Sequence, residues 1–186
     1  MTKTWDKDRI AQLLAGCFAP QASPSHANED EEDQDGPHPS IDVLITFDSQ
    51  GVSSHPNHTS LYHGARAFAA LLARRRCRSV DVYSLTSVNI LRKYVSIGDL
   101  LSTLAAYVRD TGSVLGGATG TKGERPEALV FLNELFGSSG ATRGVAWRAM
   151  TEAHQSQMRW FRYGWIVLSR YMVINDLKLE KIEEAS

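Results

Sequence analysis

Few features of this sequence suit an extracellular or membrane-spanning protein. Its two cysteines, Cys17 and Cys77, lie far apart and form no C-x-x-C pair. This argues against a disulfide framework or a thiolate zinc site and indicates a reducing, cytosol-facing compartment. No signal peptide opens the chain, and the longest apolar candidate, residues 160–174, is broken by Arg162 and Arg170, short of the ~20 apolar residues that span a bilayer. Any membrane contact is expected to be peripheral or to come from a segment outside these 186 residues.

An excess of charge of one sign is also lacking. The net charge is −1, from 20 basic and 21 acidic residues, which argues against a nucleic-acid binder driven by bulk charge. Six of the acids lie in residues 20–40, a stretch without Lys or Arg, so the rest of the chain is mildly basic. The composition of residues 20–40 cannot bury enough surface to fold, and we expect a disordered acidic insertion there.

The order of apolar residues predicts a parallel α/β core. Trp5–Leu14 has the pattern of a short amphipathic helix, with Asp6 as its cap or as an acid of its first turn. Ile41–Phe47 is a nearly continuous β-rich run, typical of a strand covered on both faces. A helix with regular apolar spacing opens at His55, and Ser79–Thr86 is the next strand. Strand, helix and strand in this order make a βαβ unit with parallel strands.

The second half of the chain is less regular. Leu91–Val108 has helical apolar spacing, residues 111–125 form a Gly-rich flexible connection, and Ala128–Leu132 is a short strand. Thr142–Asn175 predicts one or two helices. The predicted fold class is therefore α/β, in a single domain over residues 1–186.

The most distinctive motif is His55-Pro56-Asn57-His58, just past the first predicted strand. Ligand and catalytic sites of open α/β sheets collect at the carboxyl ends of parallel strands. Pro56 suits the first helical position, which puts His55 at the cap and His58 in the first turn, near one face. Two neutral imidazoles so placed share a zinc ion, or one binds metal while the other does acid–base chemistry. The alternative is that both are capping or surface histidines.

Blocks spread over most of the chain carry a resemblance to a known family. They are Thr46–His58, Leu61–Arg66, Ser87–Tyr94, Ala149–Met150, His154–Met158, Trp160–Arg162 and Ser169–Met172, preceded by Trp5-Asp6. Together, in this order, they resemble the PIG-L family, the N-acetylglucosaminylphosphatidylinositol de-N-acetylases of GPI-anchor biosynthesis, which belong to the LmbE-like superfamily.

The resemblance implies a Rossmann-like fold and zinc-dependent hydrolysis of the acetamide of a glucosamine, with release of acetate. It implies that His58 is a zinc ligand and that His55 stabilises the oxyanion or protonates the leaving amine. Asp48 lies in the matching loop, where it orients its neighbours or contacts substrate; a simple turn aspartate is the alternative. The implied partners are the glycolipid N-acetylglucosaminylphosphatidylinositol and a membrane surface, with no nucleic acid, at the cytosolic face of the endoplasmic reticulum membrane.

Three further features have a functional and a purely structural interpretation. Arg92 and Lys93 meet the inositol phosphate or form a solvated basic turn. His154 faces the substrate pocket or lies on a helix surface. The aromatic and basic residues of 159–165 form a membrane-interface segment or pack in the core.

The chain departs from the family pattern at one motif. The family's Ala-His-Pro-Asp-Asp-Glu segment, which supplies the other zinc ligands and the general base, is not found, and neither is the family's first strand. His26 and His38, in the acidic insertion, are not followed by Pro-Asp-Asp. We therefore expect weak zinc binding and little turnover from this chain alone. The alternative function is a non-catalytic, truncated module that binds lipid or a partner.

Overall fold

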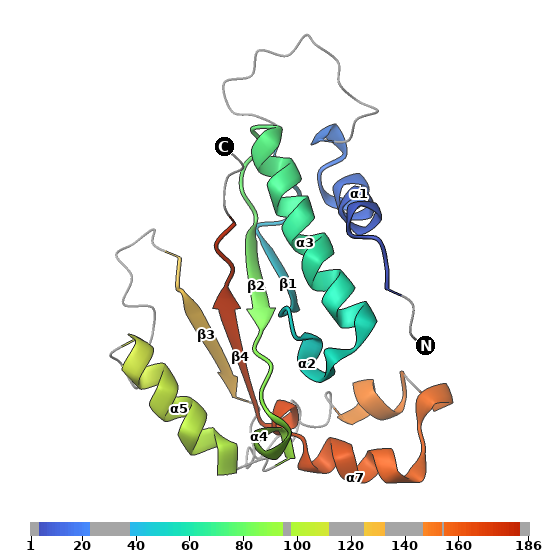
Figure 1. The fold of residues 1–186 in the computed structure, drawn as a ribbon, viewed down its shortest axis with the longest axis vertical. Helices are drawn as coiled ribbons and strands as arrows, with labels where there is room; N and C mark the ends of the chain where they lie inside the picture. Colours follow the sequence, from blue (N-terminus) through green and yellow to red (C-terminus); the bar gives the residue numbers. More distant parts are fainter. Residues whose placement is uncertain are drawn as a thin grey trace. The chain divides into compact units, whose positions relative to one another are not determined.

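A computed structural model describes residues 4–22, 38–94, 98–111, 125–132, 147–153 and 155–182. Four strands hydrogen-bond in the order β1-β2-β4-β3 and form a mixed sheet (Figure 1). The predicted α/β class is confirmed, and the arrangement is consistent with a Rossmann-like fold. The elements are α1 (Lys7–Phe18), η1 (Pro20–Ala22), β1 (Val43–Phe47), α2 (Gly51–Ser54), α3 (Pro56–Arg74), β2 (Asp81–Leu85), α4 (Ile90–Tyr94), α5 (Gly98–Thr111), β3 (Ala128–Leu132), η3 (Gln155–Gln157), α7 (Trp160–Leu168), η4 (Arg170–Met172) and β4 (Ile174–Leu179).

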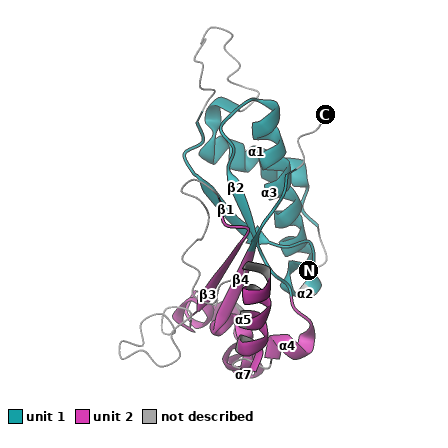
Figure 2. Ribbon diagram, turned by 90° about the vertical axis from the view of Figure 1, so that its left-hand side faces the viewer, with its two compact units in different colours: residues 1–87, 178–186 teal, residues 88–177 magenta. Residues whose placement is uncertain are grey.

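The chain divides into two compact units, coloured separately in Figure 2. One comprises residues 1–87 and 178–186, and the other residues 88–177. Most of the predicted acidic insertion and Gly-rich connection, residues 23–37 and 112–124, lies outside the described residues.

The first unit is built on the predicted strand–helix–strand segment. Asp6 caps α1, since its Oδ1 accepts hydrogen bonds from the backbone amides of Asp8 and Arg9, both at 2.8 Å. Helices α1 and α3 lie side by side (Figure 1), and a Cβ added at Gly64 of α3 would overlap the side chain of Ile10. The core around these two helices is a cluster of small and large apolar side chains: Ala11, Ala15, Ala19, Ala22, Phe68, Leu72, Cys77 and Val80.

Strands β1 and β2 are parallel and in register from Val43 opposite Asp81 to Phe47 opposite Leu85, which confirms the βαβ prediction. The prediction that β1 is covered on both faces is wrong for this structure. Val43 and Ile45 have exposed fractions of 48% and 59%. Their side chains alternate with that of Leu44, which packs against the core on the α3 side. The helix covers one face of the strand, and the opposite face is open.

The second unit contains α4, α5, β3, α7, η4 and most of β4. Strand β3 has the predicted bounds, and the helical segment predicted over Leu91–Val108 is two helices, α4 and α5. Within Thr142–Asn175, α7 confirms a helix, but Ile174 already begins β4, which the sequence did not predict. No side chain of α7 is buried, and Trp160 is 85% exposed. Its exposure favours the interface interpretation of these aromatics over core packing.

Among the described residues, no helix combines the length and the apolar character needed to cross a membrane.

Candidate functional site

The candidate site begins at the turn that follows β1. The backbone carbonyl of Asp48 accepts a hydrogen bond from the amide of Gly51 at 3.0 Å. Its side-chain Oδ1 accepts from the same amide at 2.9 Å and from the amide of Gln50 at 3.1 Å. Asp48 therefore closes the turn by accepting hydrogen bonds from backbone amides, as aspartate commonly does at such positions.

The residues after this turn form an unusual left-handed segment. Gly51, Val52 and Ser54 have φ values of +61°, +62° and +55°, and the amide of Ser54 donates to the carbonyl of Gln50 at 2.8 Å. Positive φ is costly for residues with a Cβ and is an outlier for a β-branched valine. Gly51 is required twice, because an added Cβ would also lie 3.0 Å from the Cβ of His58. Strained backbone of this kind concentrates at functional sites and persists only where neighbours hold it.

Ser87, two residues after β2, provides such a contact. Its hydroxyl donates to Asp48 Oδ1 at 2.6 Å and accepts from the amide of Val52 at 2.7 Å. Its own amide donates to Asp48 Oδ2 at 2.6 Å. Ser87 opens one of the blocks that carry the family resemblance, Ser87–Tyr94, but no sequence pattern indicated a role for it. Its place just after a strand parallel to β1 was the available signal, because the carboxyl ends of parallel strands meet at one edge.

His55 caps α3, and Pro56 occupies the start of the helix, both as predicted. Nδ1 of His55 accepts a hydrogen bond from the amide of Asn57 at 3.3 Å. An accepting Nδ1 places the ring proton of the neutral imidazole on Nε2. His55 is exposed, and its ring centroid lies 5.0 Å from that of His58. The prediction that the two imidazoles lie close together is confirmed. The alternative that His55 caps the helix also holds, through its Nδ1.

His58 is held in a different way. Its Nδ1 lies 2.9 Å from the carbonyl oxygen of Gly51, and because a carbonyl only accepts, Nδ1 carries the proton. Its ring stacks on Phe47, the last residue of β1, with 3.9 Å between centroids and 9° between planes. Because the proton of the neutral ring is on Nδ1, Nε2 keeps its lone pair. Metal-binding histidines show the same arrangement, with the distal ring N–H bonded to a backbone carbonyl and the other nitrogen available for the metal.

The described residues do not complete a metal site. They contain no group of three or more His, Cys, Asp or Glu side chains that could hold a metal ion, whereas catalytic zinc ordinarily has three protein ligands. His58 has the chemistry of one such ligand.

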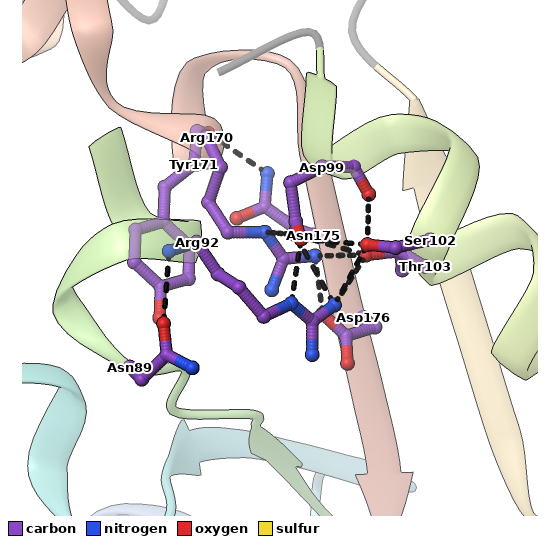
Figure 3. Close-up of polar contacts among 9 residues, drawn as sticks. All are labelled: Asn89, Arg92, Asp99, Ser102, Thr103, Arg170, Tyr171, Asn175 and Asp176. Carbon is purple, nitrogen blue, oxygen red and sulfur yellow. Dashed lines mark hydrogen bonds and ion pairs between the residues drawn. The ribbon is translucent and has the colours of Figure 1, made fainter. Parts of the chain in front are cut away.

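Arg92, another predicted substrate-binding residue, lies in the second unit. Figure 3 shows the guanidinium groups of Arg92 and Arg170 converging on Asp99. Arg92 Nε and Nη2 donate to Asp99 at 2.6 and 3.3 Å, and this bond to Asp99 raises the pKa of the Arg92 guanidinium. Burial lowers the pKa of the neighbouring Lys93 ammonium. A contact of Arg92 with phosphate stays a prediction, and His154 lies outside the described residues.

These observations define an α/β protein with paired, differently held imidazoles at the carboxyl edge of a parallel strand pair. No family model and no solved structure matches the chain. Several curated proteins match it. The chain is 40% identical over 98% of its length to an N-acetylglucosaminyl-phosphatidylinositol de-N-acetylase of Arthroderma benhamiae, covering 57% of that protein. It is 30% identical over 93% of its length to the bovine (Bos taurus) protein of the same name, covering 51% of it.

A third relative is a probable N-acetylglucosaminyl-phosphatidylinositol de-N-acetylase of Schizosaccharomyces pombe, 37% identical over 74% of the chain and 46% of that protein. The chain thus spans about half the length of the curated relatives it matches. It belongs to the PIG-L family of de-N-acetylases.

Proposed function

We propose that this chain is part of an enzyme that removes the acetyl group from N-acetylglucosaminylphosphatidylinositol in GPI-anchor biosynthesis. The main support is the histidine pair, in which hydrogen bonds fix a different tautomer on each ring. The names of the relatives supply the substrate. The reaction is hydrolysis of a linear amide, in which water enters and acetate and a free amine leave.

The two histidines have different tasks in this proposal. His58 contributes one nitrogen ligand, Nε2, to a zinc ion whose remaining ligands come from outside the described residues. Bound zinc would supply Lewis acidity and a more acidic water. His55 carries a proton on the exposed Nε2, which donates a hydrogen bond to the oxygen that becomes negative in the transition state. To give a proton to the leaving amine instead, His55 would first have to become an imidazolium, with Nδ1 protonated and no longer accepting from Asn57.

The remaining predicted residues act on the substrate or on the turn. In this proposal Asp48 orders the turn that precedes His55 through the four hydrogen bonds that its carboxylate accepts. Arg92 is placed against the inositol phosphate, since a guanidinium matches phosphate geometry. His154 is placed at the substrate pocket.

Helix α7 supports an approach to a lipid surface. Phe161 and Trp165, one turn apart, have ring centroids 5.1 Å from one another, and Trp160 is largely exposed. Arg159 and Arg162 are exposed beside them. Exposed aromatics with interspersed cations are typical of segments that lie in the headgroup region of a membrane. We therefore place the enzyme at a membrane, the cytosolic face of the endoplasmic reticulum, where a lipid-linked substrate is accessible.

The test is acetate release from N-acetylglucosaminylphosphatidylinositol by the complete translation product, with zinc added. We expect His58→Ala to abolish turnover, because the site loses a ligand, and His55→Ala to lower kcat by about 10²–10³-fold. His63→Ala is the matched control, because His63 is an exposed histidine of the same helix that packs edge-on against Tyr62. Absence of acetate release from the wild-type protein, or equal losses from all three variants, would overturn the proposal.

A further inference from the structure

The left-handed backbone at Gly51 and Val52 lies next to His58. The Gly51 carbonyl is the partner of His58 Nδ1, and its direction depends on the backbone angles of Gly51 and Val52. With φ of +62°, Val52 has a conformation that a valine does not adopt unless its surroundings impose it. The contacts that impose it therefore act on the carbonyl that bonds His58 Nδ1, while Phe47 stacks on the ring.

Two groups hold this segment from outside its own backbone. Asp48 Oδ1 accepts the amide of Gly51, and Ser87 Oγ accepts the amide of Val52. The Ser87 hydroxyl proton is in turn donated to Asp48 Oδ1. One hydroxyl thus joins the end of β1, the region after β2 and the strained residue in a single hydrogen-bonded chain.

We propose that Ser87 is a positioning residue, whose hydroxyl holds Val52 in its left-handed conformation so that the Gly51 carbonyl fixes His58 with its proton on Nδ1. Its effect on deacetylation rests on the function proposed above. Its effect on the His58 ring does not, because it follows from these hydrogen bonds alone.

The hydroxyl and the backbone of Ser87 have separable roles. The Ser87 amide donates to Asp48 Oδ2 whatever the side chain is, so Ser87→Ala keeps one tie between the two strand ends. The variant removes the acceptor for the Val52 amide and the donor to Asp48 Oδ1. We expect the segment to relax toward ordinary backbone angles and the Gly51 carbonyl to turn away from His58.

The experiment reads the His58 tautomer by 15N NMR of the zinc-free protein at a pH where imidazoles are neutral. We expect the proton on Nδ1 in the wild type and in Ser87→Thr, which keeps the hydroxyl. In Ser87→Ala we expect a shift toward the mixture of tautomers of a free imidazole. Ser49→Ala, which truncates an exposed serine of the same loop, should leave the His58 resonances unchanged.

Kinetics give a second readout. Changes to the partners that orient a metal ligand typically cost about 10–100-fold in activity or metal affinity. We expect Ser87→Ala to lower kcat by that factor with KM unchanged, and Ser87→Thr to recover it. A role in stability alone would not give this separation of kcat from KM or the tautomer shift.

The outcomes separate this proposal from the function itself. If Ser87→Ala keeps the Nδ1 proton of His58, the positioning role is overturned, whether or not the wild type releases acetate. If the wild type is inactive but the tautomer shifts, the positioning role stands and the proposed function fails. Should Ser87→Ala not fold, Ser87→Cys, of similar shape but with a weak donor and acceptor, is measured instead, and an unchanged tautomer in that variant also overturns the proposal.

Discussion

Two carboxylates, Asp48 in the first unit and Asp99 in the second, each gather several hydrogen-bond donors, but of different kinds. The donors to Asp48 are neutral: the amides of Gln50, Gly51 and Ser87 and the Ser87 hydroxyl. Those to Asp99 include the charged guanidinium of Arg92, and the guanidinium of Arg170 forms an ion pair with the same carboxylate. Arg92 and Arg170 lie 2.6 and 2.8 Å from its oxygens, and the hydroxyls of Ser102 and Thr103 donate at 2.8 and 3.0 Å.

The two groups also differ in burial. Both side chains of the Arg170–Asp99 pair are almost fully buried, with exposed fractions of 0% and 2%. Asp176 adds a second carboxylate 2.9 Å from Arg170 (Figure 3), so two cations face two anions. Asp48 is half-buried, and no cation contacts it among the described residues. A charge-balanced, buried cluster holds the second unit together, whereas Asp48 accepts hydrogen bonds from neutral donors and closes the turn that leads to His55 and His58. Asp48 thus belongs to the site, and the buried contacts of Arg170 with Asp99 and Asp176 serve stability.

Replacing Asp99 should have the largest effect on stability. In Asp99→Ala the buried guanidinium of Arg170 loses its partner at 2.8 Å and keeps Asp176 at 2.9 Å. Removing one partner of a buried ion pair typically costs up to about 3–5 kcal/mol. Urea unfolding of the chain measures the loss. Glu152→Ala is the control, since it breaks an exposed pair with Arg148 at 3.2 Å and should cost about 0.3–0.5 kcal/mol. Similar losses in the two variants would show that the Asp99 cluster does not stabilise the fold.

Acid should weaken the same cluster. Burial raises the pKa of the Asp99 carboxyl, but hydrogen bonds from Arg92 and Ser102 and the charge of Arg170 outweigh it, so that this pKa lies below its usual value. A carboxyl with a lowered pKa in the folded state stabilises the protein above the unfolded pKa of about 3.9, and this contribution is lost as pH falls through the folded value. Below about pH 4 the free energy of unfolding should therefore fall more steeply in the wild type than in Asp99→Asn. Parallel profiles in a series of urea titrations would contradict this.

Local sequence patterns predicted the first unit better than the second. A regular apolar period predicted helix α3, and β-rich runs predicted strands β1 and β2. The open face of β1 was not predicted. Strand β4 was missed because Asn175, Asp176 and Lys178 interrupt its apolar pattern. Pairing with other strands defines β4. Just after the strand, for example, the amide of Glu180 donates a hydrogen bond to the carbonyl of Val82 in β2 at 2.8 Å.

The site shows the same limit. His55 and His58 were found because their spacing and the proline between them are local signals. Ser87 was given no role, since a serine after a strand has no pattern of its own and its contact with Asp48 joins residues 39 positions apart. The left-handed angles of Val52 and Ser54 were likewise invisible, because neither residue type favours them.

Gly51→Ala tests the turn that follows Asp48. An alanine there would have to keep a φ of +61° with its Cβ 3.0 Å from both His58 Cβ and Thr59 Oγ1, and the left-handed conformation alone costs about 1–2 kcal/mol. We expect a loss of at least about that size in urea unfolding. Deacetylase activity should fall by a larger factor than in the Glu152→Ala control, because His58 moves with the turn. Unchanged stability and activity would show that the turn accommodates a side chain and does not position His58.

The same substitution at Gly164 should have the smallest effect, and of opposite sign. Gly164 lies in the middle of α7, where an added Cβ would meet nothing within 4 Å. Because glycine inside a helix is less favourable than alanine by roughly 0.5–1 kcal/mol, Gly164→Ala should stabilise the protein by up to that amount in urea unfolding. Adding one methyl group should thus lower the free energy of unfolding at Gly51, where the backbone conformation requires glycine, and raise it at Gly164, which lies in an ordinary helix. If Gly164→Ala destabilised the chain instead, the open surroundings of α7 would be wrong, and with them its assignment to a lipid surface.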